Sequence, residues 1–183
     1  MGFIEVKPRS FVYLLQPKPV AIIVSVDVNG KSNGMSAAWL TPTSRDPPLL
    51  AVAISPKRYT YELIKQSRDF TVNILDSSMV DEAELFGSLS GRDVDKFKKS
   101  KLTLVKSNVV KSPHIAEALT AIECTLYNEY SAGDHQLIIG RVEKVYVREG
   151  VLEEDVYDIS KAKVLLYLGG GSYTTTIDRT LTR

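Results

Sequence analysis

Several residue types that would indicate a particular chemistry are scarce in this sequence. Its 183 residues include one cysteine, Cys124, which excludes an intramolecular disulfide and a multi-thiolate metal site. The two histidines, His114 and His135, have no partner at metal-ligand spacing, so no bound metal is expected. Walker A and Gly-x-Ser-x-Gly sequences are missing, and the glycines at 169–171 do not complete a Gly-x-Gly-x-x-Gly turn. Together these absences argue against a P-loop, a hydrolase elbow and a Rossmann unit.

A large net charge and long apolar runs are also absent. The 23 basic and 22 acidic residues leave a net charge of +1, so no overall field attracts nucleic acid or acidic lipid. Apolar stretches such as residues 20–24 are far too short to cross a bilayer, and the N-terminus lacks the apolar core of a signal peptide. We therefore expect a cytoplasmic protein with no nucleic-acid or membrane partner, folded as one domain over residues 1–183.

Short apolar runs predict a mainly β protein. Residues 20–28 form a β-branched run that ends at Asn29-Gly30, the strongest short hairpin signal. Strand-like pieces follow at 35–40 and 49–55, too close together for helical crossovers, so antiparallel pairing is expected. Further strands are predicted at 70–74, 122–127, 137–147 and 164–168. The strand at 137–147 is expected to change face near 143–144.

Helices are predicted between these strands. Residues 59–68 suit a short helix with Thr60 as its cap, and Ser78 begins a capping box before a helix that reaches about Phe86. Residues 92–101 predict a short helix whose basic side chains face solvent. Residues 151–163 indicate a loop with helical turns. The predicted fold is mainly β with inserted helices, arranged as a closed or nearly closed antiparallel barrel.

The segment Ser55-Pro56-Lys57-Arg58-Tyr59-Thr60 is the first candidate site. It places two hydroxyls and two cations between the end of a strand and the start of a helix. Free amides and the positive end of the helix dipole would hold a phosphate monoester there. The alternative is that Thr60 only caps the helix while Lys57 and Arg58 face water.

The segment 33–39 is the second candidate. Its small residues and the nearby Gly30 and Gly34 would let a planar ligand lie against the backbone, with Met35 and Trp39 as apolar cover. A tightly packed core strand is the alternative. His135, at a predicted hairpin tip, is either solvated or functional. Cys124 is expected to be inert in the core.

These pieces occur in an order that is shared with one known family. They are Pro19-Val20, Asn29-Gly30, Asn33-Gly34-Met35-Ser36-Ala37-Ala38-Trp39, Asp46-Pro47-Pro48, Thr60, Phe70-Thr71-Val72-Asn73, Ser90-Gly91-Arg92-Asp93-Val94-Asp95-Lys96-Phe97, Gly133-Asp134-His135 and Ile139-Gly140-Arg141-Val142. In this order they resemble the flavin reductase-like family of FMN-binding split β-barrel proteins. The similarity covers residues 17–147, with a weaker echo at 164–173. The subgroup it most resembles contains archaeal-type flavin and ferric reductases and flavoredoxin-like carriers.

The resemblance implies a split β-barrel, a homodimer and FMN near the subunit interface. It places the phosphate at residues 55–60 and the isoalloxazine ring along 35–39, with His135 near a nicotinamide site. The cofactor contacts that it implies are Asn33, Met35, Ser36, Ala37, Ala38, Trp39, Ser55, Lys57, Arg58, Thr60 and Lys96.

Two functions follow from this resemblance. In the first, the protein is an FMN-dependent oxidoreductase that accepts hydride from NADH or NADPH and passes electrons to free flavin, a ferric chelate or a partner protein. In the second, it is an FMN-binding electron carrier, flavoredoxin-like, without nicotinamide activity of its own. Hydride transfer needs two rings held in contact rather than an acid or base, so His135 is expected to orient the nicotinamide.

Overall fold

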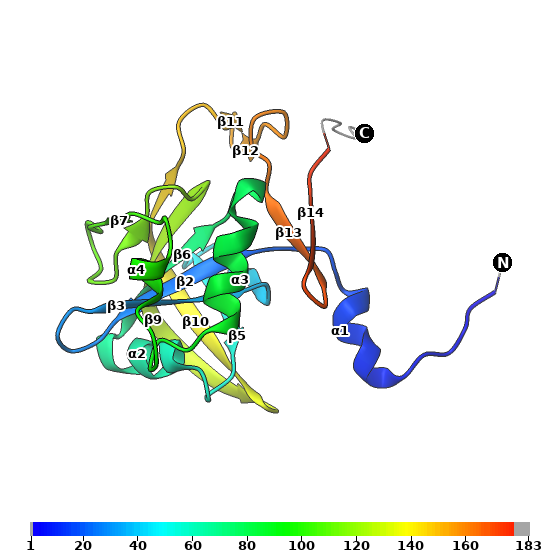
Figure 1. Cartoon of the computed structure of the whole chain (residues 1–183), viewed down its shortest axis with the longest axis horizontal. Helices are drawn as coiled ribbons and strands as arrows, with labels where there is room; N and C mark the ends of the chain where they lie inside the picture. Colours follow the sequence, from blue (N-terminus) through cyan, green and yellow to red (C-terminus); the bar gives the residue numbers. More distant parts are fainter. Residues whose placement is uncertain (1, 178–183) are drawn as a thin grey trace.

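The fold is organised around one large antiparallel sheet. The computed structural model describes residues 2–177, and within them seven strands pair in the order β3-β2-β6-β9-β10-β5-β4 (Figure 1). Their bounds are β2 (Ala21–Val26), β3 (Ser32–Ala37), β4 (Leu40–Ser44), β5 (Leu49–Ile54), β6 (Asp69–Ile74), β9 (Thr120–Ala132) and β10 (His135–Val147).

The sheet curls so that distant strands share one core. Three strands separate β2 from β5 in the sheet order, yet Ile23 of β2 and Val52 of β5 lie in the same buried cluster. Phe70, Cys124 and Ile138 fill the same interior. This arrangement confirms the predicted antiparallel barrel.

The β2 strand is buried on both faces, which explains its continuous apolar sequence. Ala21 and Ile23 point into the barrel, whereas Ile22 and Val24 pack with Ala83 and Phe86 of helix α3. A strand covered on both sides shows no polar alternation. The Asn29-Gly30 hairpin prediction is confirmed, because β2 and β3 pair directly and Gly30 has φ of 81°.

Two helices cover the sheet, and their caps differ from the prediction. Helix α2 (Tyr59–Ser67) has Arg58 as N-cap without a side-chain cap bond, so Thr60 is not a cap. The capping box at Ser78 is also wrong: Asp76 caps the 3₁₀ helix η2 (Ser77–Met79), and α3 (Val80–Ser88) follows with no side-chain cap. The basic segment yields only a short helix, α4 (Lys96–Lys99).

The remaining elements are short and lie outside the seven-stranded sheet. The face change predicted near 143–144 is confirmed by a register shift between Val142 and Lys144. Residues 151–163 contain two short paired strands as well as turns, a departure from the predicted loop. The smaller elements are η1 (Pro8–Ser10), α1 (Phe11–Leu14), β1 (Lys18–Pro19), β7 (Leu104–Val105), β8 (His114–Ile115), β11 (Leu152–Glu153), β12 (Val156–Tyr157), β13 (Leu165–Gly169) and β14 (Ser172–Thr175), with β1, β13 and β14 forming a three-stranded sheet.

Two buried carboxylates and the cysteine lie within the strands. Glu123 accepts backbone hydrogen bonds from Asn108 and Val109 at 2.9 and 2.7 Å, and Asp69 accepts one from Ser112 at 3.1 Å. They fasten the segment 107–112 to the sheet. Cys124 is fully buried, and burial raises the pKa of its thiol, which confirms its prediction as core.

Helix lengths also bear on the membrane question. Among the described residues, no helix is both long and apolar enough to traverse a bilayer.

Candidate functional site

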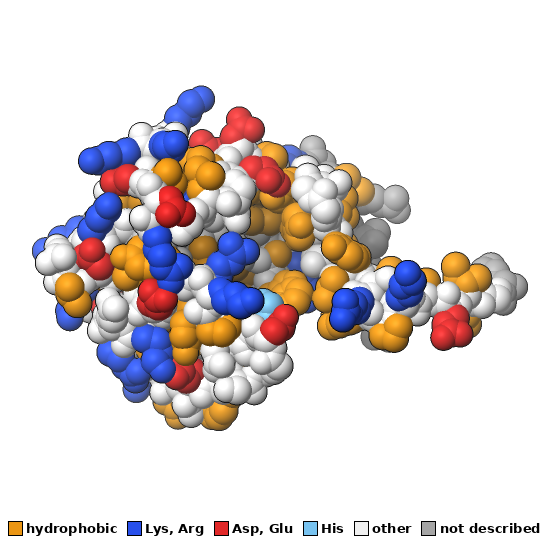
Figure 2. Space-filling model, turned by 60° about the horizontal axis from the view of Figure 1, so that its bottom comes forward, with side chains coloured by type: hydrophobic (Ala, Val, Ile, Leu, Met, Phe, Trp, Pro, Cys, Tyr) orange, Lys and Arg blue, Asp and Glu red, His pale blue; other side chains and the backbone are white. Residues whose placement is uncertain are grey.

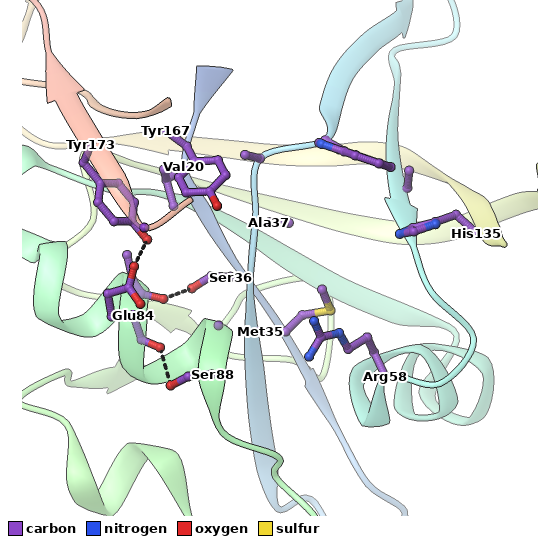
Figure 3. A pocket seen from close by; sticks show the side chains of 16 residues that line it. Val20, Met35, Ser36, Ala37, Arg58, Glu84, Ser88, His135, Tyr167 and Tyr173 are labelled. Carbon is purple, nitrogen blue, oxygen red and sulfur yellow. Dashed lines mark hydrogen bonds between the residues drawn. The ribbon is translucent and has the colours of Figure 1, made fainter. Parts of the chain in front are cut away.

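A cleft opens between β3, α3 and the β13–β14 hairpin. This larger cavity encloses about 430 Å³, a volume in the range of ligand pockets. In Figure 3, Arg58 and His135 stand on one side of β3, and Glu84 and Tyr173 on the other. The lining residues are Val20, Met35, Ser36, Ala37, Ala38, Trp39, Ala53, Arg58, Ala83, Glu84, Gly87, Ser88, His135, Tyr167, Gly171 and Tyr173.

A smaller, cation-rich cavity of about 100 Å³ adjoins the cleft. The two share Met35 and Arg58, so together they form one elongated site. The lining of the smaller cavity comes from β3, the start of α2 and the segment after α3: Asn33, Met35, Lys57, Arg58, Tyr59, Thr60, Phe86, Leu89, Ser90, Gly91, Arg92 and Lys96. Lys and Arg side chains gather on the face seen in Figure 2.

Thr60 and Asn33 form the floor of this cavity. Thr60 is 1% exposed, and its hydroxyl accepts a hydrogen bond from Asn33 Nδ2 at 2.9 Å. Gly91 closes over this pair, since a Cβ atom at position 91 would lie 2.0 Å from Asn33 Oδ1. Only glycine fits there, and both residues are held in place.

Arg92 is a site residue that the sequence reasoning did not single out. Its guanidinium pairs with Glu62, donates to the Lys57 carbonyl at 3.3 Å and lies over the Tyr59 ring at 5.1 Å. These contacts fix a second arginine beside Arg58 at the α2 N-terminus. The motif at 90–97 lay within the resemblance, but nothing local distinguished Arg92 from its basic neighbours.

Lys96 corrects the prediction that every cation of this segment faces solvent. It is 4% exposed, and its Nζ donates to the carbonyls of Phe86 and Leu89, each at 3.2 Å. The ammonium also lies 5.3 Å from the Phe86 ring centre. Burial, with a further contribution from Arg58, lowers the pKa of Lys96 to about 8.

The part of the larger cavity next to β3 and β5 is lined by small, uncharged side chains. Ala37, Ala38 and Ala53 line it, and Ser36 donates to the Ala83 carbonyl at 2.6 Å, which joins β3 to α3. Small side chains leave room for a flat ring against the strand.

Trp39 and His135 meet at the edge of this part of the cavity. Their ring centroids are 4.9 Å apart, and His135 Nδ1 lies 2.8 Å from Asp134 Oδ1. His135 begins β10 and is half-buried rather than fully solvated at a hairpin tip. The hydrogen bond to His135 lowers the pKa of Asp134.

Two tyrosines that the sequence did not mark as site residues form the far wall. The Tyr167 and Tyr173 rings are 5.3 Å apart, and the Tyr173 hydroxyl donates to Glu84 at 2.7 Å. Desolvation and this carboxylate raise the pKa of Tyr173. The hairpin is thereby attached to α3.

The donor set suits a ligand with a phosphate ester at one end and an uncharged ring at the other. Lys57, Arg58 and Arg92 supply cations near the uncapped start of α2, whose free amides favour an anion. Of the predicted contacts, Ser55 alone lines neither cavity. No cluster of metal-ligating side chains occurs within residues 2–177. These features fit FMN.

A family model described as "Flavin reductase like domain" matches residues 14–176. The chain belongs to the flavin reductase-like family. The match extends past the 17–147 range of the sequence resemblance and includes the β13–β14 hairpin.

Known relatives and solved structures agree with this assignment. The chain is 36% identical over 151 residues to a protein from Aeropyrum pernix, covering 82% of this chain but 57% of that relative. It is 28% identical to a flavin reductase from Pseudomonas putida, covering 85% of this chain and 81% of that enzyme.

Two solved structures match over all of this chain. The FMN-binding protein from Thermus thermophilus with bound 1-cyclohex-2-enone has a TM-score of 0.88 and 31% identity, with 99% of its chain covered. Flavoredoxin of Desulfovibrio vulgaris has a TM-score of 0.87 and 28% identity, with 96% covered. The predicted split β-barrel class is therefore confirmed.

Proposed function

We propose that this family member binds FMN in the elongated cleft and acts as an oxidoreductase that accepts hydride from NADH or NADPH. The observation that carries the proposal is that the cation-rich cavity and the alanine-lined larger cavity lie side by side and share Met35 and Arg58 as lining residues. The phosphate would lie by Lys57, Arg58 and Arg92, and the ring would lie along 35–39. The Thermus thermophilus neighbour, an FMN-binding protein with the same fold, supports the proposal that this chain binds FMN.

Bound FMN would supply two-electron redox chemistry, and the residues of the chain would orient both partners. The hydrogen bond from Ser36 to the Ala83 carbonyl holds β3 against α3, so the spacing of these two walls of the larger cavity is fixed. Trp39 and His135 form an aromatic edge on which a nicotinamide ring would rest, and Asp134 fixes the imidazole. Positioning of this kind is a sufficient protein contribution to hydride transfer.

The proposal also names the class of electron acceptor. We propose free flavin, a ferric chelate or a redox protein as acceptor, in keeping with the flavin reductase relative from Pseudomonas putida. The test is an anaerobic titration of the FMN-supplemented protein with NADH and then NADPH, followed by visible absorption. We expect a bound-flavin spectrum that bleaches with at least one nicotinamide. A protein that binds no flavin would overturn the proposal.

The second candidate is an electron carrier without nicotinamide activity. The flavoredoxin neighbour, at 28% identity over the whole chain, favours it. In this case the bound flavin resists both nicotinamides but is bleached by a low-potential redox protein or by dithionite. The same titration therefore separates the two functions.

The N-terminal arm supports a homodimer. In Figures 1 and 2 the arm extends away from the barrel, and it exposes Phe3, Ile4 and Leu14, with Leu14 69% exposed. An apolar groove between Phe11, Leu15 and Leu137 adjoins the cleft through Trp39 and Ala53. A second copy of the chain would cover this surface and lie next to the flavin. Sedimentation equilibrium should give a dimer, and Leu14→Asp should weaken it; a monomer at micromolar concentration would contradict the proposal.

A further inference from the structure

Lys96 occupies an unusual place in the cleft. It lies in the four-residue helix α4, yet it is buried in the lining of the small cavity. Two of the three donors of its ammonium group bond the carbonyls of Phe86 and Leu89. Phe86 belongs to the last turn of α3, and Leu89 follows that helix. The ammonium thus satisfies carbonyls at the negative end of the α3 dipole.

This contact shapes the wall of the phosphate cavity. Leu89 begins the segment that carries Ser90, Gly91 and Arg92 along the cavity. Gly91 in turn faces Asn33 so closely that a Cβ atom at position 91 would lie 2.0 Å from Asn33 Oδ1, and Asn33 bonds Thr60. A chain of contacts therefore leads from the Lys96 charge to each side of the cavity.

The charges around Lys96 are mostly of its own sign. Lys57, Arg58 and Arg92 line the small cavity with it. Lys31 and Asp95 line a neighbouring recess, and the Tyr59 phenol lines both this recess and the small cavity. Asp95 is turned to α4, where it accepts from the Lys98 amide and pairs with the Lys98 ammonium. Glu62 pairs with Arg92. An anion in the cavity would relieve this repulsion.

We propose that Lys96 makes the site select flavins that carry a phosphate monoester, by coupling uptake of a proton on its buried amine to binding of the phosphate. The inference rests on the proposed FMN function and adds the means of selection and its pH dependence. Before the phosphate binds, desolvation and the neighbouring cation lower the pKa of Lys96 to about 8. A phosphate dianion nearby favours the ammonium and raises that pKa. FMN affinity must then fall as pH rises through about 8.

The test compares the Kd of FMN with that of riboflavin, which has the same ring but no phosphate, from pH 7 to pH 9.5. A phosphate monoester with its second pKa near ~6 is already a dianion throughout this range. We expect the FMN Kd to rise by about fivefold or more, within the tenfold per pH unit that one coupled proton allows. The riboflavin Kd should change by less than about twofold. Calorimetry at pH 8 in two buffers of different ionisation enthalpy should show proton uptake with FMN only.

Variants assign the effect to this residue. Lys96→Met should weaken FMN binding at pH 7 by about tenfold to a hundredfold, abolish proton uptake and leave riboflavin binding unchanged. Lys96→Arg keeps a charge at every pH, so its FMN Kd should be flat to pH 9.5. Lys99→Met, an exposed lysine of the same helix, is the matched control and should behave as wild type.

The outcomes separate this inference from the function on which it rests. If FMN binds at no pH, the proposed function fails. If FMN binds with a Kd that is flat in pH, or if riboflavin follows the same curve, only the role of Lys96 is overturned. The wild-type comparison decides this even when Lys96→Met does not fold.

Discussion

The rings of Trp39 and His135 meet in a tilted arrangement at the edge of the cleft, with centroids 4.9 Å apart and planes inclined by 36°. Two segments almost a hundred residues apart thus meet where a second planar molecule would approach a bound flavin. Asp134 holds the imidazole from the outside through Nδ1.

Replacement of His135 tests this arrangement. His135→Ala should slow NAD(P)H-driven flavin reduction by about tenfold or more, because loss of positioning misaligns the reacting rings. FMN affinity should change by less than about threefold. Stopped-flow absorbance would measure the reduction, with His114→Ala as control, since His114 stacks on Tyr146 away from the cleft lining. Equal, measurable rates in wild type and His135→Ala would mean that His135 does not position the nicotinamide, whereas no reduction in either protein would favour the electron carrier.

Arg58 links the two cavities and lies at the α2 N-cap. Arg58→Ala should weaken FMN binding by about 1.5–3 kcal/mol through loss of a charge-assisted phosphate contact. Riboflavin binding should change little. Fluorescence titration gives both constants, and the exposed Arg45→Ala is a control for charge alone. An unchanged FMN Kd would mean that Arg58 faces only solvent.

Gly91 tests the floor of the small cavity. Gly91→Ala puts a methyl group where Asn33 Oδ1 lies, so Asn33 must move away from Thr60. We expect a loss of about 1–3 kcal/mol in unfolding free energy and weaker FMN binding. Urea unfolding and flavin titration would measure these. Gly87→Ala is the comparison for stability, because its methyl group meets Ser36 Cβ at an ordinary 3.7 Å; equal losses in both variants would argue against a special role for position 91.

Glu123 gives a pH-dependent prediction away from the site. Burial alone would raise its pKa, but backbone hydrogen bonds from Asn108 and Val109 outweigh burial and lower it. A carboxylate with a lowered folded pKa stabilises the fold above its unfolded pKa, near ~4.3, and loses this contribution as pH falls through the folded pKa. Glu123→Gln should therefore cost about 1–3 kcal/mol at pH 7.

The acid limb provides the check on Glu123. The difference in unfolding free energy between wild type and Glu123→Gln should shrink in urea melts taken below about pH 4. The exposed Glu149→Gln should show no difference at either pH. If the difference in unfolding free energy between wild type and Glu123→Gln does not change with pH, the loss of stability comes from packing and not from the charge of Glu123.

Much of the barrel could be predicted because its signals are local. The Asn29-Gly30 turn and the alternation at 70–74 specify strands within a few residues. Lys57, Arg58 and Thr60 likewise lie next to each other in the chain, so their gathering at one end of the cleft needed no tertiary information.

The rest of the site depends on contacts between distant segments. The Tyr173–Glu84 bond joins residues 89 positions apart. Lys96 resembles its solvated neighbours in sequence and is buried only because α3 ends beside it. Thr60 has the sequence of a cap, but its hydroxyl accepts a hydrogen bond from Asn33 of strand β3. Local propensity contains none of these relationships.

The burial of Cys124 also makes the chain convenient for labelling. Its single thiol is enclosed between strands and holds its proton more firmly than a free cysteine, so maleimides will not reach it in the folded state. A cysteine introduced on the surface would be the sole reactive position, with no background substitution needed. Spin or fluorescent probes could thus be attached one site at a time to a protein with an otherwise native sequence.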